Sequence, residues 1–356
     1  MYLNIKRDSK QWDMTESAIR GCLRNFVDDV ISSKLRFMPV KKPVHHSSST
    51  NDETILSEEE TMTSNEEILD KWDNMSQTLI AVLTHVGEKE ISQAAQYQLL
   101  DMIITATRMP IGYRKLRACL PETLLSLLLK VAGLGDIGAN LRSLKLLQHI
   151  IDRHSLRFHV SVPRIFRESD HFAKIKSNED DLEYFRLQRK DVYDSLYRSF
   201  LTHSNVMSNL EALFCAVCLI LIEVQYPHTA RDIAELMVNI QDAVINIPDL
   251  PIQSPRVSAW IHSTVISVLS FIACIHGLTD LKTLVSEVVS RRSEVAPFLI
   301  PPLKAKYTIG DITDFKEDVF FNHVLVRRCL TNACFDNRKI RIENTVGISA
   351  VMPEIE

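Results

Sequence analysis

The chain has very little glycine, with 9 glycines among 356 residues. Glycine makes up about 7% of an average protein, and it readily adopts the positive φ angles that phosphate-binding loops and many tight turns need. Its scarcity argues against an enzyme built on phosphate-binding loops and against a β-barrel with many turns. It favours helices joined by short polar connections.

The chain also lacks an excess of positive charge. It holds 41 lysines and arginines against 45 aspartates and glutamates, which gives a formal net charge of -4 and an isoelectric point near 6.3. Nucleic-acid binding asks for a basic surface. We therefore expect no nucleic-acid partner.

The cysteines do not form a disulfide framework or a complete metal site. Their number, seven, is odd, and the polar stretch Met1–Lys10 lacks the apolar core of a signal peptide, so we expect reduced cytosolic thiols. Cys215 and Cys218 form a C-x-x-C pair, but no second pair or nearby histidine completes a zinc site. We expect both cysteines in the core on one helix face, and we expect no metal and no cofactor.

Two long apolar runs raise the question of a membrane span. Ala212–Ile222 is far shorter than the roughly 20 residues that cross a bilayer, and this predicts a buried helix. Val257–Leu278 is long enough, and no Asp, Glu, Lys or Arg lies between Arg256 and Asp280. The run nevertheless includes His262, His276 and several hydroxyl side chains. We expect it to be the central helix of a helical stack, with a transmembrane helix as the alternative.

Apolar residues recur at helical spacing along most of the chain, and little indicates strands. Gly133 and Gly277 stand where helices should end. Successive helices of this size with short loops predict an all-α fold, an armadillo- or HEAT-like α-solenoid of antiparallel helix pairs. The apolar stripes behind this prediction are Ile19–Ile31, Ile68–Val86, Leu144–Ile151, Ile233–Val244 and Leu281–Val289.

Composition divides the chain into four parts. Residues 1–39 predict an N-terminal helical segment, and 40–63 hold a Ser-rich and then Glu-rich tract that is too polar to bury a core, which predicts a disordered linker. Residues 64–336 carry the solenoid, with an irregular stretch at Arg157–Ser177. Residues 337–356 predict an extended C-terminal tail.

The catalytic motifs are incomplete. Gly133, Gly135 and Gly138 match the G-x-G-x-x-G fingerprint, which binds a pyrophosphate where a strand leads into a helix. The preceding segment is leucine-rich with helical spacing, so we expect a turn between two helices. A serine hydrolase needs G-x-S-x-G, and the nearest approach, at Ser349, lacks the second glycine. We therefore expect a protein that is not an enzyme.

Two groups of residues are candidate partner-binding residues. Arg291, Arg292 and Glu294 stand near the end of a predicted helix, where the helix dipole favours cations, and a partner contact is the alternative explanation for them. In the tail, sparse apolar side chains predict either docking along a partner groove or packing back on the last helices of the chain. These tail residues are Ile342, Val346 and Ile348.

Several segments resemble, in the same order and spacing, the C-terminal half of the rolling blackout proteins, also called the Eighty-Five-Requiring-Three family. These segments are Leu147–His154, Asp191–Phe200, Ile240–Ile245, Asp249–Pro251 and Arg291–Pro301. The resemblance covers about Glu66–Asp311. It implies an armadillo- or HEAT-like rod that is a scaffold on the cytoplasmic face of the plasma membrane. Such a scaffold recruits phosphatidylinositol 4-kinase type III alpha, with a tetratricopeptide-repeat adaptor and hyccin, to make phosphatidylinositol 4-phosphate there.

The sequence departs from this family at its start. The family begins with a palmitoylated cysteine cluster, whereas Met1–Lys6 has none and Cys22 falls on an apolar helix face. Stable membrane attachment needs an acyl chain or a dense polybasic patch, so we expect this chain alone to be cytosolic and to reach the membrane only through the complex. A serine lipase, an activity proposed for the family, and a generic helical-repeat interaction module are the alternative functions.

Overall fold

The computed structural model describes five stretches of the chain: residues 76–84 without 78 and 82, 93–106, 115–247 without 134, 168, 171, 173, 174, 176 and 177, 254–303, and 317–332. Within these stretches every regular element is a helix, which confirms the all-α prediction. The predicted segments 1–39, 40–63 and 337–356 lie outside the described residues.

The bounds of the helices follow the chain in order. The α-helices are α3 (Gln93–Ala106), α4 (Leu116–Cys119), α5 (Glu122–Ala132), α6 (Ile137–Ile151), α7 (Glu179–His203), α8 (Met207–Glu223), α9 (Pro227–Asn246), α10 (Pro255–His276), α11 (Thr279–Val295) and α12 (His323–Asn332). The 3-10 helices are η1 (Arg157–Val160), η2 (Pro297–Leu299) and η4 (Glu317–Val319).

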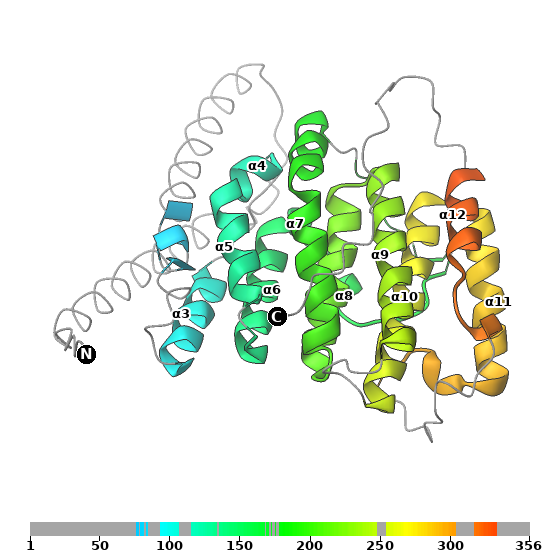
Figure 1. Cartoon of the computed structure of the whole chain (residues 1–356). Helices are drawn as coiled ribbons and strands as arrows, with labels where there is room; N and C mark the ends of the chain where they lie inside the picture. The colour runs from blue at the N-terminus through cyan, green and yellow to red at the C-terminus, as the bar shows by residue number, and fades with distance from the viewer. Residues whose placement is uncertain are drawn as a thin grey trace, which may run out of the picture.

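The α-helices stack in two layers along the length of the molecule (Figure 1). In one layer α3, α6, α8 and α10 pack against one another in that order, and in the other layer α5, α7, α9 and α12 do the same. Consecutive helices alternate between the layers, as α5 does with α6 and α9 with α10, while α11 packs on both α10 and α12. Because each helix packs mainly on its near neighbours, the architecture is the α-solenoid that the sequence predicts.

Local signals set where the helices begin and end. The Asp136 carboxylate accepts the N–H of Ala139 at 2.7 Å and caps the start of α6. Gly277 ends α10 in the left-handed conformation, with φ of 64°, and the next residue, Leu278, donates its N–H to the carbonyl of Ala273 at 2.9 Å. This is a Schellman-type end, for which glycine is the preferred residue.

The two apolar runs are both internal helices. The irregular stretch after α6 lays Phe166 over α8 and α10, with its ring centroid 6.4 Å from that of Phe214 and 4.7 Å from that of Phe271. The N–H of Phe166 also donates to Ser270 Oγ at 3.1 Å. Helix α10 is long and apolar enough to cross a membrane, yet 83% of its most apolar stretch is buried inside the fold. Its burial favours the predicted central helix over the transmembrane alternative.

The C-x-x-C pair lies in the core. Cys215 and Cys218 are unpaired thiols on α8, with 3% and 0% of their surface exposed. Burial raises the pKa of Cys215 to about 12, so its thiol stays protonated at neutral pH and is a poor metal ligand or nucleophile. The prediction of two core cysteines on one helix face is confirmed.

Candidate functional site

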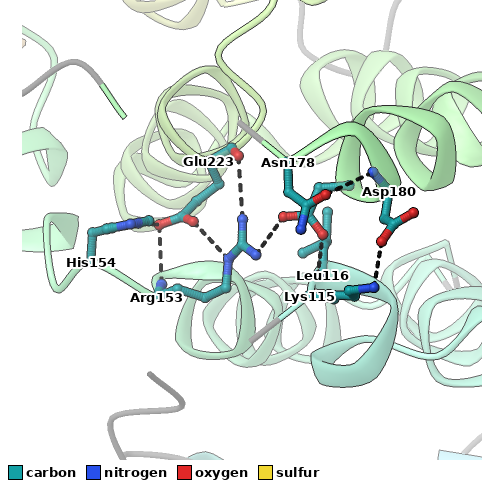
Figure 2. Close-up of polar contacts among 8 residues, drawn as sticks. Lys115, Leu116, Arg153, His154, Asn178, Asp180 and Glu223 are labelled. Atoms are coloured by element: carbon teal, nitrogen blue, oxygen red, sulfur yellow. Dashed lines mark hydrogen bonds and ion pairs between the residues drawn. The ribbon is translucent and has the colours of Figure 1, made fainter. Parts of the chain in front are cut away.

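A buried ion cluster joins the ends of four helices (Figure 2). Arg153 follows the end of α6; its Nε donates to Glu223 Oε2 at 2.8 Å and its Nη1 donates to Asp181 Oδ2 at 2.7 Å. Glu223 is the last residue of α8, and Asp181 lies in the first turn of α7. The other oxygen of Asp181 accepts the N–H of Leu116, the first residue of α4, at 2.5 Å. One arginine therefore ties α6 and α8 of one layer to α7 of the other, at the ends of these helices.

The charged groups of this cluster are almost fully removed from water. The side chains of Arg153, Asp181 and Glu223 are 6%, 4% and 1% exposed. Burial lowers the pKa of Arg153, but the hydrogen bond to Asp181 and the charges of both carboxylates outweigh burial, so its pKa is raised. His154 Nδ1 lies 2.8 Å from Glu223 Oε1 and adds a fourth member. The carboxylates are held by these contacts, so the cluster is a structural joint rather than an acid–base pair.

The rim of the cluster is exposed and less important for stability. Lys115 Nζ lies 2.5 Å from Asp180 Oδ2, with the two side chains 61% and 59% exposed. Asn178 caps α7 by accepting the N–H of Asp180 at 3.0 Å (Figure 2). Water screens an exposed ion pair, which therefore adds little stability, so most of the stabilisation comes from the buried part.

A narrow, mostly apolar cavity lies beside Glu223. Its volume is about 20 Å³, and its walls include Leu116, Tyr184, Phe185 and Ile220. The Tyr184 hydroxyl is already engaged, because it donates to the carbonyl of Leu120 at 2.5 Å. A space of this size corresponds to about one water molecule, so it is too small for a substrate.

The glycine motif is a turn between two helices, as predicted. Gly133 ends α5, Gly135 has φ of 77°, and Gly138 lies in the first turn of α6. A Cβ on Gly138 would overlap the ring of Tyr97 from α3. The three glycines are thus explained by helix termination, backbone conformation and close packing, and an α-helix precedes the motif where a dinucleotide site has a strand.

Arg292 is buried rather than available to a partner, which corrects its assignment as a candidate contact residue. It is 0% exposed, and its guanidinium donates to the carbonyls of Val319, Leu299 and His262 at 2.8, 2.8 and 3.1 Å. Burial lowers its pKa to about 9. Arg292 therefore holds η2 and η4 against α10, which is a structural role.

The other predicted contact residues of α11 are on the surface. The side chain of Arg291 is 51% exposed and donates to the carbonyl of Asp318 at 3.2 Å, and Glu294 is exposed near the end of the helix. Val295 follows with 56% exposure. Ile342, Val346 and Ile348 lie outside the described residues. The structure thus leaves Arg291 and Glu294 accessible, and their role stays a prediction.

Sequence reasoning missed one surface feature, the η1 turn. Phe158 on this turn is 78% exposed, the largest value among the described large hydrophobic residues. Its segment shows no periodicity, so the sequence could not tell whether the ring lies in the core or in solvent. The only signal was the run Arg157–Arg167, which has three arginines, one histidine and no acidic residue.

The described part of the chain offers no metal centre. Within the described stretches, no group of three or more His, Cys, Asp and Glu side chains could hold a metal ion. Histidines in the core there are held neutral: burial, with the nearby charge of Arg292, lowers the pKa of His262 well below its usual value.

Comparison with known proteins agrees with this architecture. The family model described as "EFR3, armadillo repeat" matches residues 18–334. Human protein EFR3 homolog B is 24% identical over 188 residues, which are 52% of this chain and 22% of that protein, and the mouse homolog B matches with the same values. EFR3 homolog A of Xenopus laevis is 24% identical over 223 residues, 62% of this chain and 26% of its own length.

No solved structure matches the chain. The chain spans about a quarter of the length of the curated relatives that it matches. The family match covers most of the chain and coincides with the two-layer helical stack. We conclude that the chain belongs to the EFR3 family and carries its armadillo-repeat region.

Proposed function

We propose that this chain is a non-catalytic scaffold module. It helps to recruit a phosphatidylinositol 4-kinase type III alpha complex to the plasma membrane, where the kinase makes phosphatidylinositol 4-phosphate. The partners are the kinase, its tetratricopeptide-repeat adaptor and a hyccin-like subunit. The observation that carries the proposal is the EFR3 armadillo-repeat match over residues 18–334. We also propose that these segments correspond to the C-terminal half of the family's chain.

The physical basis is local concentration. A scaffold that holds a soluble kinase at a bilayer raises its encounter rate with lipid without supplying a catalytic group. A rod with a continuous core suits this role, since stacked repeats present a large surface without needing a pocket. The complex would act on the cytoplasmic face of the plasma membrane. We propose that this chain reaches the membrane indirectly, through the complex, and is cytosolic alone.

The proposed contact residues are at the C-terminal end of the rod. Arg291 and Glu294 are exposed on α11, while Arg292 beneath them fixes the neighbouring segments. We retain the tail residues Ile342, Val346 and Ile348 as part of this surface. Arg291 and Glu294 carry opposite charges, so they favour a partner surface that also carries both signs.

A binding experiment tests the proposal. The purified chain, and a second version ending at Asp336, are used to capture the purified kinase–adaptor–hyccin complex. Arg291→Glu combined with Glu294→Arg should weaken capture, whereas Lys282→Glu, an exposed change on the same helix, should not. Loss of capture only when the tail is removed would assign the contact to the tail.

The same protein also tests the two alternative functions. Serine-dependent hydrolysis of a diacylglycerol by the purified chain would overturn the scaffold proposal in favour of a lipase. Failure to capture any subunit of the complex, with the fold intact, would leave a generic helical-repeat interaction module.

A further inference from the structure

A small hydrophobic cluster lies beside α10 and α11, apart from the main core. Val319 of η4 is buried in it, and the ring of Phe320 packs against it. The other buried members are Ala259, Ala296, Phe298 and Leu299. Phe321, the next residue along the chain, belongs to the main core. Segments that are held by few apolar contacts open at a lower cost in free energy than core helices do. We call residues 317–321 the η4 segment.

Two buried polar side chains fasten the η4 segment to the helices. Arg292 of α11 donates from Nε to the carbonyl of Val319 at 2.8 Å. Gln241 of α9 donates from Nε2 to the carbonyl of Phe321 at 2.8 Å, and its Oε1 accepts the Phe321 N–H at 2.9 Å. Arg292 and Gln241 are 0% and 1% exposed. The η4 segment is therefore held by a few specific hydrogen bonds, which must break together for it to detach.

His262 of α10 lies against the η4 segment. It is 0% exposed, and its ring centroid is 5.0 Å from that of Phe320. Neither of its ring nitrogens has a hydrogen-bond partner among the described residues. A charged imidazole at this position would therefore be buried with no described group to accept its hydrogen bonds, which is unfavourable.

The charged group that acts on His262 is itself a cation. Arg292 donates from Nη1 to the backbone carbonyl of His262 at 3.1 Å. Burial, together with the charge of Arg292, lowers the pKa of His262 well below its usual value. Several acidic side chains of the surrounding elements have other partners: Glu223 with Arg153, Glu235 with Arg327, Asp242 with His323 and Asp318 with Arg291. A proton on His262 would thus be repelled by Arg292 while the η4 segment is in place.

We propose that the η4 segment is an acid-released latch, which detaches from α10 when His262 takes up a proton. The imidazole binds the proton in the open form, where water solvates the charge. Acidification therefore favours opening, because a proton that binds one form alone shifts the equilibrium towards that form. Opening also breaks the 3.2 Å hydrogen bond from Arg291 to the carbonyl of Asp318, so it changes the surroundings of a proposed contact residue. The latch does not depend on the proposed function.

Hydrogen exchange of the full chain, read by mass spectrometry at pH 7 and pH 5, measures this opening. A histidine exposed in the open form has a pKa of about 6.5. Because the closed form binds no proton in this range, the equilibrium constant for opening should rise about 25-fold from pH 7 to pH 5. The Phe321 N–H reports the rise, after correction for the intrinsic pH dependence of exchange. It should also exchange faster than the N–H groups of α8 at both pH values, because the latch opens without the rod.

Three variants separate His262 from other titratable groups. His262→Gln and His262→Leu both remove the ring that binds the proton, and both should abolish most of the rise. His276→Gln is the matched control, because His276 ends the same helix and burial lowers its pKa to about 4. The rise should persist in this control. Circular dichroism at pH 5 should show intact helices in the unchanged chain and in the variants.

Three results would each overturn the latch. An equal rise in His262→Gln and in the unchanged chain would assign the pH dependence to another group, such as the pair formed by His323 Nε2 and Asp242 Oδ2, which are 2.9 Å apart. An opening constant that stays the same at pH 7 and pH 5 in the unchanged chain would show that no proton is linked to opening. Exchange of the Phe321 N–H no faster than that of α8 would show that the η4 segment opens only when the whole rod unfolds.

Discussion

Removing the arginine of the buried ion cluster should be among the most damaging single changes in the rod. Arg153→Ala deletes three side-chain hydrogen bonds, to Glu223 Oε2 at 2.8 Å, to Asp181 Oδ2 at 2.7 Å and to the Glu223 carbonyl at 3.3 Å. It also leaves two carboxylates buried without their cation, since these side chains are 1% and 4% exposed. Breaking such a pair from one side costs about 3–5 kcal/mol.

The matched control is an arginine with equally good geometry on the surface. Arg186 binds Glu183 through two contacts of 2.8 Å, but the two side chains are 50% and 56% exposed. Arg186→Ala should therefore cost far less stability than Arg153→Ala, because water screens an exposed ion pair. Urea unfolding at pH 7, followed by circular dichroism, measures both variants. Equal losses for Arg153→Ala and Arg186→Ala would refute the claim that burial makes the cluster important.

Three further predictions concern His262, Gly138 and Arg292. Neither imidazole nitrogen of His262 has a hydrogen-bond partner among the described residues, and its pKa in the folded protein is lowered, so below about pH 6.5 the proton binds at this position only in the unfolded chain. His262 therefore makes the folded protein less stable as the pH falls, and His262→Leu should reduce the loss of unfolding free energy between pH 7 and pH 5. An unchanged pH dependence, measured by urea unfolding, would contradict this. Gly138→Ala should cost about 1–3 kcal/mol through overlap with Tyr97, and thermal unfolding of the same change in a Tyr97→Ala background should show a smaller penalty. Arg292→Lys should lower the free energy of unfolding by at least about 2 kcal/mol, because an ammonium cannot reach three carbonyls in the same geometry. The exposed neighbour is the control: Arg291→Ala should lower it by less than about 1 kcal/mol in the same urea assay.

The fold was predictable because helical periodicity and helix-ending residues recur locally. The apolar stripes of α9 and α11 and the glycine at the end of α10 lie where the structure places helices and a helix end. The apolar stripe of α11 also indicated that Arg292 is buried. Leu281, Val285, Val288 and Arg292 follow one another at helical spacing and are the buried residues of α11, so the periodicity placed the arginine on the inner face.

The ion cluster was not predictable in the same way. The segment Leu147–His154 contributes to the family resemblance, but its Arg153 binds Asp181 and Glu223, which are 28 and 70 residues away. Such pairs depend on how the layers stack, and no local pattern encodes them. The exposure of Phe158 has the same origin, because only the packing of η1 on α8 decides which side of the turn faces solvent.

The most direct test of the scaffold proposal is a reconstituted kinase reaction. The chain is tethered by an engineered histidine tag to vesicles that contain phosphatidylinositol and a nickel-chelating lipid, and the soluble kinase–adaptor–hyccin complex is then added. The account predicts that phosphatidylinositol 4-phosphate forms faster on vesicles that carry the chain, in proportion to the amount of complex recruited, and that the chain alone changes no lipid. Equal rates with and without the tethered chain, or lipid hydrolysis by the chain alone, would contradict it.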